Sequence, residues 1–404
     1  MHPKHKFLFH FTHKETLGHA TRLTSLVNAL TKTIPCEVYI LQGGVPQNFI
    51  IFPAKAKIYH IPYPFDSKIS FNGPRATVHA RERAGFILNI IKEVRPTAFI
   101  TEFFPFGRLE CLPELLPSLH FLKTSKTRIF ASIGYPLLSD LIRHKEDRLI
   151  KLLPSVSQLF DHIFIHTPPL LENPYVHACL TTDKQRAFYK TFLESIAAKT
   201  SYTGYIVPHK ILEPSHADPI KRPKGICTVL LSRGSGAVNP KLIANAISAQ
   251  AILGNKYRLI AVCGPATSAT EITFFKQHIK KTKAQNTLLL KSTADLMKLL
   301  KDSDISISLC GYNTSVQLMQ AQKPAIIIPW QNPTSKDATT DQLARARLLQ
   351  ERFNATIIPY DKLSAQLLAA TIKKIHSRGI TPPVAPAGWF NGARTMARLV
   401  QQKI

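Results

Sequence analysis

Acidic residues are scarce in this sequence. Among 404 residues, 25 are Asp or Glu and 52 are Lys or Arg, which gives a formal net charge of +27 at pH 7. A charge excess of this size concerns the partners of a protein more than its fold. Nucleic acid, an anionic membrane surface or a phosphate-rich small substrate would each suit it, and a lysine-rich solvated surface is the alternative.

Paired cysteines and long apolar runs are lacking too. The six cysteines are widely spaced without any C-x-x-C pair, so nothing supports a zinc site or a thioredoxin-like motif, and we expect a reducing cytoplasm. No window approaches about 18 consecutive apolar residues, so no membrane-spanning helix is expected. The apolar run at 7–11 is too short and too rich in His for a signal peptide.

Short apolar runs alternate with helical patterns in the first half of the chain. KFLFHF (6–11) predicts a buried strand, and apolar residues at helical spacing predict a helix from Gly18. Further strands are predicted at 37–42, 97–103, 128–134 and 162–168. Residues 207–225 then hold four prolines, as a linker does.

The same pattern restarts after this break. Strands are predicted at 226–232, 257–264, 286–291, 305–311 and 324–330, and an amphipathic helix at 389–402. Strands separated by helices are typical of parallel, doubly wound sheets. The sequence therefore predicts an α/β protein with Rossmann-like domains at 1–207 and 226–386, a linker at 208–225 and a C-terminal helix within 387–404.

The segment 305–330 is the most specific for chemistry. A predicted strand ends at Leu309, Gly311 permits a tight turn, and a helix is predicted from Thr314. Backbone N–H groups at a helix N-terminus, together with the side chains of Asn313, Thr314 and Ser315, would form a cradle for an anion such as a diphosphate. The alternative is an ordinary N-capped helix, because Asn and Thr are good caps.

Three further loops follow predicted strands of the second half. Asp341 and Gln342 open a helix, where a carboxylate beside an amide suits sugar hydroxyls, although Asp341 is also a good N-cap. Arg345, one turn later, would meet phosphate or pair with Asp341. The other two loops are glycine turns, SRGSG (232–236) and Cys263–Gly264–Pro265. All would lie at the carboxyl ends of parallel strands, where open α/β sheets bind ligands.

In the first half, TLGHATRL (16–23) and TEFFPFGR (101–108) carry polar residues after predicted strands. His19 lies on the apolar stripe of its helix, so it is either a core histidine or an active-site group. Arg22, one turn later, has a structural or a phosphate-facing role. Glu102 is either a carboxylate of the site or a cap or partner of Arg108.

With these segments assembled, the chain resembles a glycosyltransferase of the GT-B fold. The resemblance is carried by LGHATR, TEFFPFGR, SRGSGAV, CGYNTSVQLMQAQKPAIIIPW and DQLARARLL, which occur in order over nearly the whole chain. It is strongest to bacterial predicted glycosyltransferases related to the peptidoglycan-precursor N-acetylglucosaminyltransferase family. It implies two domains that face a cleft, the first for an acceptor and the second for a nucleotide-sugar, with the final helix crossing back to the first domain.

The resemblance also implies roles for individual residues. His19 would be the base, with Glu102 the alternative carboxylate. Arg233 or Arg345 would help the helix N-terminus to stabilise the diphosphate. The remaining residues implied to contact substrate are Gly18, Arg22, Gly234, Ser235, Gly264, Gly311, Tyr312, Asn313, Thr314, Ser315, Gln317, Asp341 and Gln342. Gln317 stands where the family often has a Glu for the ribose hydroxyls, and HKETLGH (13–19) has less glycine than usual.

The expected reaction is transfer of a sugar from a UDP-linked donor to a hydroxyl acceptor, inverting and independent of metal or other cofactors. A lipid-linked acceptor and peripheral contact with the cytoplasmic membrane would account for the basic charge, with 141–153 as the candidate contact. A nucleotide-sugar hydrolase or epimerase on the same fold is the alternative. Nucleic acid is not expected as a partner, because no helix-turn-helix, zinc or aromatic–basic pattern is present.

Overall fold

The computed structural model describes residues 5–12, 18–44, 52–53, 56–63, 74–134, 147–171, 180, 182–208, 224–236, 239–293, 295–330 and 341–404, of which 74–78, 147–150, 171 and 341 are described by their backbone only. Two compact units are present: one holds Met1–Lys14, His19–His209 and Ala387–Ile404, and the other holds Glu15–Gly18 and Lys210–Pro386. Residues 209–223 of the predicted linker and 141–146 of the predicted membrane contact at 141–153 lie outside the described residues.

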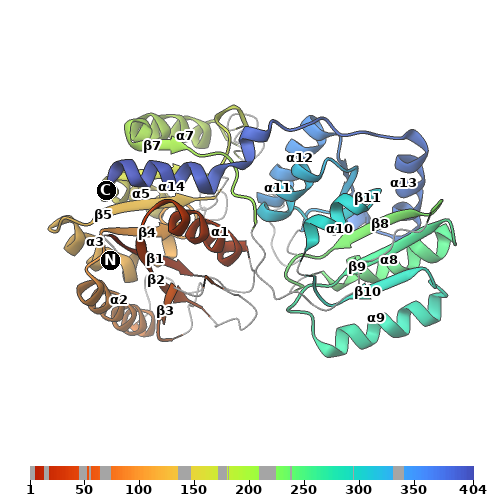
Figure 1. Ribbon diagram of the computed structural model, residues 1–404, viewed down its shortest axis with the longest axis horizontal. Helices are drawn as coiled ribbons and strands as arrows, with labels where there is room; N and C mark the ends of the chain where they lie inside the picture. Colours follow the sequence, from red (N-terminus) through yellow and green to blue (C-terminus); the bar gives the residue numbers. More distant parts are fainter. Residues whose placement is uncertain are drawn as a thin grey trace. The chain divides into compact units, whose positions relative to one another are not determined.

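The first unit is built on a seven-stranded parallel sheet in the order β3-β2-β1-β4-β5-β6-β7 (Figure 1). The strands are β1 (His5–Thr12), β2 (Cys36–Gly43), β3 (Ala56–His60), β4 (Ala98–Glu102), β5 (Arg128–Ile133), β6 (His162–Ile165) and β7 (Thr200–Tyr202). The chain order reverses between β1 and β4. This reversal matters because the loops that leave two such strands diverge and open a crevice at their carboxyl ends.

Helices cover both faces of this sheet, as the alternation of side chains along β1 requires. Phe7, Phe9 and Phe11 point to the layer of α1 (Gly18–Thr33) and α14 (Gly392–Lys403), where they join one hydrophobic core. His10 points to the opposite layer, where its Nε2 lies 3.3 Å from Glu114 Oε1 on α3 (Leu112–Lys123).

Glu114 is buried and is also paired with Arg83 of α2 (Pro74–Val94). Burial alone would raise the pKa of Glu114, but His10 and Arg83 outweigh burial and hold this pKa below its usual value. The remaining helices of the unit are α5 (Asp147–Gln158) and α7 (Asp183–Ile196). On the side of the sheet that α2 and α3 cover, these ionic groups are thus buried as a mutually paired set.

The C-terminal helix belongs to the first unit, as predicted. Met396, Ala397 and Val400 of α14 are buried in the same core as the phenylalanines of β1. The chain enters this helix through Ala387–Phe390, a short 3-10 turn, and the Gly392 N–H donates to the Tyr205 carbonyl oxygen at 3.0 Å. The predicted single helix at 389–402 is thus a turn followed by a helix.

The second unit repeats the plan with six parallel strands in the order β10-β9-β8-β11-β12-β13. The strands are β8 (Cys227–Ser232), β9 (Tyr257–Val262), β10 (Thr287–Leu290), β11 (Ile305–Ser308), β12 (Ala325–Ile327) and β13 (Thr356–Ile357). The helices are α8 (Pro240–Leu253), α9 (Ala269–Thr282), α10 (Leu296–Asp302), α11 (Tyr312–Ala321), α12 (Asp341–Phe353) and α13 (Ala365–Arg378). Helices α8 and α13 pack on one another and share a core with β8 and β11.

The predicted fold class of two doubly wound α/β domains is confirmed, and every predicted strand is present. Three strands, β3, β7 and β13, have no counterpart in the prediction. Each lies at an edge of its sheet and is only two to five residues long, with its side chains half-buried or exposed. An edge strand of this kind lacks the apolar run by which a central parallel strand is found.

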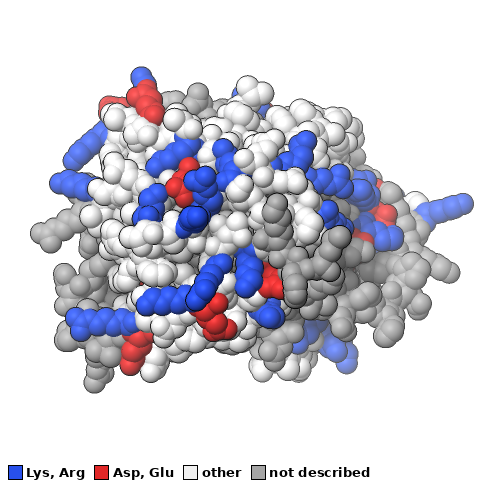
Figure 2. Space-filling view, turned by 60° about the vertical axis from the view of Figure 1, so that its left-hand side comes forward, with Lys and Arg blue, Asp and Glu red and all other residues white. Residues whose placement is uncertain are grey.

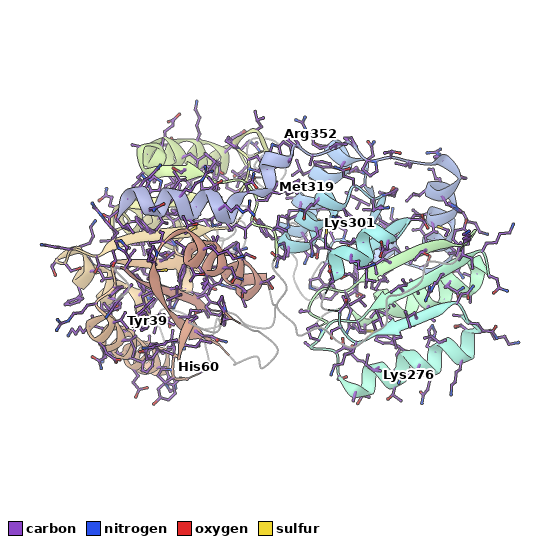
Figure 3. The ribbon with its side chains drawn as sticks, in the orientation of Figure 1. Tyr39, His60, Lys276, Lys301, Met319 and Arg352 are labelled. Atoms are coloured by element: carbon purple, nitrogen blue, oxygen red, sulfur yellow. The ribbon has the colours of Figure 1, made fainter. Side chains whose placement is uncertain are left out.

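Basic side chains are spread over the surface. Figure 2 shows one face of the molecule, on which Lys and Arg side chains clearly outnumber Asp and Glu. Figure 3 labels three exposed basic residues, Lys276, Lys301 and Arg352, which come from three different helices of the second unit. Among the helices of the described residues, none has the length and apolar character that a membrane crossing needs.

The two glycine turns of the second unit, 232–236 and 263–267, pack directly on one another. Gly264 has φ +101°, and a Cβ atom built on it would overlap the Gly236 nitrogen and lie 2.6 Å from the Gly234 carbonyl oxygen. The Ala266 N–H also donates to the Ser235 carbonyl oxygen at 2.9 Å. Gly264 therefore serves both a left-handed backbone and a close approach of two loops.

This packing predicts that Gly264→Ala destabilises the second unit by roughly 3–5 kcal/mol, because left-handed strain and overpacking add. Gly379→Ala is the matched control: Gly379 has φ +57° but no atom within 4 Å of a built Cβ, so only about 1–2 kcal/mol should be lost. Urea unfolding of both variants measures the difference. Equal losses would contradict the packing argument.

Candidate functional site

The first unit gathers four ionisable side chains at the carboxyl ends of β1 and β4, where its chain order reverses. His19 lies in the first turn of α1, which follows β1, and Glu102 is the last residue of β4. Their side chains meet, with His19 Nδ1 2.6 Å from Glu102 Oε2. The Glu102 side chain is 1% exposed and that of His19 is 14% exposed, so only the imidazole reaches solvent.

Arg22 supports Glu102 from one turn further along α1. Its guanidinium forms an ion pair with the other carboxylate oxygen, Oε1, and lies over the ring of Phe103 at 5.1 Å from the ring centroid. The same Phe103 ring meets the His19 imidazole edge-on, with centroids 5.1 Å apart. Phe103 has φ +68°, an uncommon backbone for a bulky residue that concentrates at functional sites.

Gly134 at the end of β5 leaves the space that this arrangement needs. A Cβ atom built on it would lie 2.5 Å from the Phe103 ring and 2.7 Å from Arg22 Nη1. No larger residue fits unless Phe103 or Arg22 moves.

Arg108 determines the tautomer of His19. Its Nη2 lies 3.1 Å from His19 Nε2. A guanidinium donates hydrogen bonds and accepts none, so Nε2 carries the lone pair. Nδ1 lies 2.6 Å from Glu102 Oε2 and 3.4 Å from Arg22 Nη2, so its short contact is with the carboxylate, to which it donates the proton. An imidazole is arranged as a general base when one ring N–H donates to a buried carboxylate and the other ring nitrogen carries the lone pair.

The structure decides among the roles that the sequence leaves open in this unit. Glu102 pairs with His19 and Arg22, so the alternative of a Glu102–Arg108 pair is wrong. Arg108 instead contacts His19 and, at 3.3 Å, Glu110. Arg22 is 2% exposed and is engaged with Glu102, which gives it a structural rather than a phosphate-facing position. The described residues contain no group of three His, Cys, Asp or Glu side chains that could hold a metal ion.

A second histidine, His166, lies behind this cluster at the end of β6. It is fully buried, with Nε2 2.8 Å from Ser132 Oγ and Nδ1 2.8 Å from Thr203 Oγ1. Burial holds the pKa of His166 well below its usual value, and the nearby charge of Arg22 adds to this effect. Ser132 is the register partner of Glu102 in the sheet, so this neutral polar network lies beside the carboxylate.

Sequence reasoning missed Phe103, Gly134 and His166 as members of this site. One signal was available for each. Phe103 directly follows Glu102, whereas Gly134 and His166 follow the next two strands of the sheet at the same carboxyl edge.

In the second unit, α11 presents an open N-terminus just beyond β11. The helix begins at Tyr312, two residues earlier than predicted, and its N-cap residue makes no side-chain capping hydrogen bond. Gly311 occupies the N-cap position with φ −64° and ψ 158°, and a Cβ atom built on it would meet no atom within 4 Å. We had expected Gly311 to permit a tight turn, but its backbone angles do not require glycine. Its missing side chain instead leaves the first N–H groups of the helix approachable, as anion binding requires.

The side chains of the first turn of α11 differ in what they can contribute. Tyr312, Asn313 and Thr314 are half-buried, and Gln317 is half-buried one turn later. Ser315 is buried, and its hydroxyl donates to the Tyr312 carbonyl oxygen at 2.7 Å. The Ser315 hydroxyl thus bonds its own helix, which differs from the expected place in an anion cradle.

Two residues of α12 shape the loops beside Gly311. The side-chain oxygen of Gln342 accepts the backbone N–H groups of Cys310, at 3.1 Å, and Trp330, at 3.0 Å. Arg345 is buried, and its Nε donates to the Cys310 carbonyl oxygen at 2.7 Å. Gln342 therefore holds the ends of β11 and β12 together, and Arg345 fixes the end of β11. The side chain of Asp341 lies outside the described residues.

Arg233 has a similar supporting position, which differs from its expected contact with phosphate. Its side chain is 0% exposed. The guanidinium donates to the carbonyl oxygens of Cys263 and Gly236, to the Thr267 hydroxyl and to Glu271, at distances of 2.7–3.0 Å. Arg233 thus fixes the two glycine turns to each other, while Gly234 at the tip of its turn is exposed.

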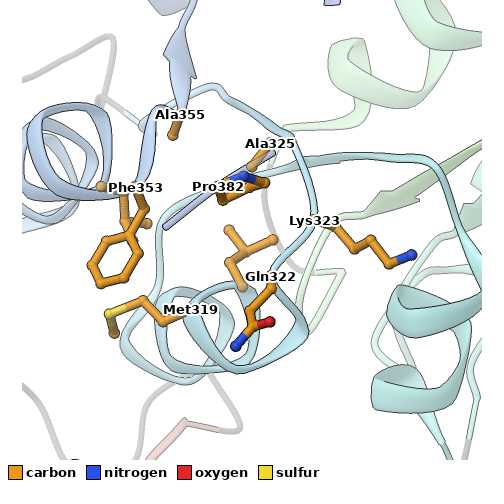
Figure 4. A pocket seen from close by; sticks show the side chains of 9 residues that line it. Met319, Gln322, Lys323, Ala325, Phe353, Ala355 and Pro382 are labelled. Carbon is orange, nitrogen blue, oxygen red and sulfur yellow. The ribbon is translucent and has the colours of Figure 1, made fainter. Parts of the chain in front are cut away.

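A small apolar pocket elsewhere in this unit takes no part in the site. Figure 4 shows that Met319 and Phe353 line it together with Ala325 and Pro382. It lies at the C-terminal part of α11, whereas Gly311 lies at the opposite end of that helix. Its lining is mainly apolar, with Gln322 and Lys323 as its polar side chains.

Comparison with known proteins places this second unit in a family. Residues 232–383 match the glycosyltransferase family 28 C-terminal domain. A curated relative is the UDP-N-acetylglucosamine–N-acetylmuramyl-(pentapeptide) pyrophosphoryl-undecaprenol N-acetylglucosamine transferase of Prochlorococcus marinus (strain MIT 9312), 27% identical over 157 residues, which are 38% of this chain and 39% of the relative. The chain thus aligns with well under half the length of that relative.

Solved structures extend the likeness to the whole fold. MurG of Acinetobacter baumannii covers 98% of this chain and 99% of its own, with a TM-score of 0.59 and 13% identity. A UDP-glucosyltransferase from Polygonum tinctorium covers 99% of this chain and 93% of its own, with a TM-score of 0.61 and 12% identity. The chain therefore has the GT-B fold of these solved structures, and its second unit carries the match to the glycosyltransferase family 28 C-terminal domain.

The buried His166 generates a prediction about pH. Because its pKa is low in the folded state and about 6.5 in the unfolded state, the unfolded chain binds an extra proton below pH 6.5, and stability falls as the pH falls. His166→Gln removes this proton linkage. Its destabilisation relative to the natural chain should shrink by up to about 1.4 kcal/mol per pH unit below pH 6.5, measured by urea unfolding at pH 7.5, 6.5 and 5.5. A pH-independent difference would contradict a neutral buried imidazole.

Proposed function

We propose that this protein transfers a sugar from a nucleotide-diphosphate sugar to a hydroxyl group of an acceptor. The observation that carries the proposal is the match of residues 232–383 to a glycosyltransferase C-terminal domain, in which α11 presents an uncapped and approachable N-terminus. A UDP-linked donor is proposed because the names of the curated relative and of the Polygonum enzyme both specify UDP. In this proposal the second unit binds the donor and the first unit binds the acceptor.

The departing diphosphate needs its growing negative charge stabilised. In our proposal the first N–H groups of α11 supply this, since they carry the positive end of the helix dipole and the N-cap residue Gly311 has no side chain that could cap the helix. Asn313 and Thr314 add polar side chains at the same helix end, and Gln342 keeps the neighbouring loop in place. Backbone donors then do what a metal ion does in other transferases, so we propose a metal-independent reaction.

The acceptor hydroxyl must lose a proton as it attacks. We propose that His19 Nε2 accepts this proton and that Glu102, which already holds Nδ1–H, stabilises the resulting imidazolium. Arg22 pairs with the Glu102 carboxylate and orients it. A single displacement with one base inverts the anomeric carbon, because the acceptor attacks opposite the departing diphosphate.

A lipid-linked acceptor follows from the name of the curated relative, which contains pyrophosphoryl-undecaprenol. Such an acceptor would bring this protein to the cytoplasmic membrane as a peripheral partner, and the formal charge of +27 would favour anionic lipids. The direct test of the whole proposal is a thermal-shift screen against UDP-, GDP-, dTDP- and CDP-sugars, followed by product analysis with and without acceptor. Stabilisation by none of them would refute the donor site, and sugar release that ignores the acceptor would indicate a hydrolase.

Removal of the base predicts a loss of turnover without a loss of donor binding. His19→Gln and Glu102→Gln should each lower kcat by about 10²- to 10⁴-fold, the usual contribution of general base catalysis. The affinity for the nucleotide-sugar should change little, as calorimetry would measure. His120→Gln, at an exposed position on α3, is the control and should leave kcat unchanged. Near-normal turnover in His19→Gln would remove the proposed base.

Side chains added at Gly311, beside the N-terminus of α11, should weaken donor binding, whereas removal of the base should not. Gly311 has φ −64°, which any residue adopts, and space around it, so Gly311→Ala and Gly311→Val should fold. They should lose only about 1 kcal/mol of stability, because Ala and Val are poorer N-cap residues than Gly. Their added methyl groups would lie where the diphosphate approaches the helix. The dissociation constant of the nucleotide-sugar should therefore rise in the order Gly, Ala, Val, by about tenfold or more for Val if one charge-assisted contact is lost. Unchanged affinity in Gly311→Val would contradict this donor site.

A further inference from the structure

Arg108 and Arg22 both reach the His19–Glu102 pair, but they are held very differently. Arg22 is in direct ion contact with the buried carboxylate of Glu102 and lies over Phe103. Among the described residues, Arg108 pairs with one carboxylate, that of Glu110, at 3.3 Å and through a single nitrogen. Its other side-chain contact in this part of the chain is with the His19 imidazole.

The guanidinium of Arg108 is also incompletely satisfied. The residue is 8% exposed, and its Nε–H is buried without a hydrogen-bond partner among the described residues. A buried donor without a partner costs free energy. A planar guanidinium is also well suited to a phosphate group, which it can bind through two parallel hydrogen bonds. The side chain therefore carries a positive charge that the protein itself compensates only in part.

The contact with His19 conflicts with the proposed chemistry. Arg108 Nη2 donates to the lone pair of Nε2, which is the atom that has to accept the proton of the acceptor. While this hydrogen bond exists, the lone pair is occupied, and a cation beside it opposes protonation of the ring. His19 can therefore act as a base only after the hydrogen bond from Arg108 to Nε2 is broken.

We propose that Arg108 is a displaceable gate that responds to a phosphate group on the acceptor. The phosphate binds the guanidinium and draws it from Nε2, so the lone pair becomes available when an acceptor with the right anionic group is bound. The proton then moves from the acceptor hydroxyl to Nε2. The hydroxyl oxygen forms the new bond to the anomeric carbon of the sugar as the bond from this carbon to the diphosphate breaks, and the nucleoside diphosphate leaves with the electron pair. Arg108 is a positioning and specificity residue here, and this inference rests on the proposed role of His19.

This gate selects acceptors by charge. A neutral acceptor leaves Arg108 on His19 and finds the base occupied, whereas a phosphate-bearing acceptor both binds and activates. Water carries no charge to displace Arg108, so the same contact suppresses hydrolysis of the donor when no acceptor is present. The gate thus favours transfer over hydrolysis.

The contact itself is tested by NMR of the full chain with 15N-labelled histidine, without any need for turnover. His19→Gln identifies the His19 signals, which should show a proton on Nδ1 and an acceptor Nε2. Octyl phosphate should shift the Nε2 signal in the natural chain, whereas sodium chloride at equal ionic strength should not. In Arg108→Gln, which is neutral and of similar length, the shift should disappear. In Arg398→Gln, an exposed position on α14 of the same unit, it should persist.

Three outcomes of this experiment would overturn the proposal. The first is a proton on Nε2, the second an equal response to octyl phosphate in Arg108→Gln, and the third a response to UDP but not to octyl phosphate, which would assign the group to the donor. Thermal unfolding of each variant checks its fold. Arg108→Lys, which keeps the charge without the planar fork, should retain a weakened response.

The kinetic test compares two acceptors with the same sugar hydroxyl, joined to an octyl chain either directly or through a phosphate. The natural chain should prefer the phosphate-linked acceptor in kcat/KM by about tenfold or more, the size of a charge-assisted contact, and Arg108→Gln should bring the ratio close to one. An unchanged ratio would refute the gate. If neither acceptor is glycosylated by the natural chain, the proposed transfer fails, while the NMR result still decides whether Arg108 leaves His19.

Discussion

The buried carboxylate of Glu102 is the constraint on which the candidate site of the first unit depends. It ends a central strand and is almost fully excluded from water, and an unpaired charge in such a place costs several kcal/mol. Two partners remove that cost: Arg22 takes one oxygen and the His19 N–H takes the other. Both partners come from α1, which explains why the first turns of that helix carry polar groups on an otherwise apolar helix.

Several other features of the unit follow from this one requirement. Arg22 reaches Glu102 only because Gly134 leaves room for its guanidinium and for the Phe103 ring. Phe103 lies where it does because the backbone turns left-handed directly after Glu102. The neutral His166 network fills the polar space beside the carboxylate without adding a competing charge, since burial and Arg22 keep that imidazole unprotonated.

The two units use the same topology for different chemistry. Each reverses its strand order once, and each places its candidate site at the carboxyl ends of the two strands concerned. The first unit fills this place with ionisable side chains. The second leaves its helix N-terminus bare at Gly311 and puts its arginines behind the loops. Arg233 and Arg345 satisfy carbonyl oxygens of irregular backbone there, because loops lack the regular partners that strands and helices provide.

The sequence by itself determined the α/β class, the repeat of one strand–turn–helix plan in two halves, the central strands and the final helix. It did so because buried parallel strands are continuous apolar runs and amphipathic helices repeat every 3.6 residues. It also singled out His19, Glu102 and the Gly311 region, because each lies where a predicted strand ends. The sequence did not predict the edge strands β3, β7 and β13, since they are too short and too exposed to form a recognisable apolar run.

Only the tertiary structure decided which side chains face each other at those strand ends. Side-chain direction at a turn depends on a few backbone angles, such as φ +68° at Phe103, that no periodicity records. For that reason Glu102 paired with Arg22 instead of Arg108, and Arg233 turned inward instead of toward a ligand. The tautomer of His19 was decided in the same way, because it depends on a guanidinium 89 residues away in the chain, which the fold alone brings to 3.1 Å.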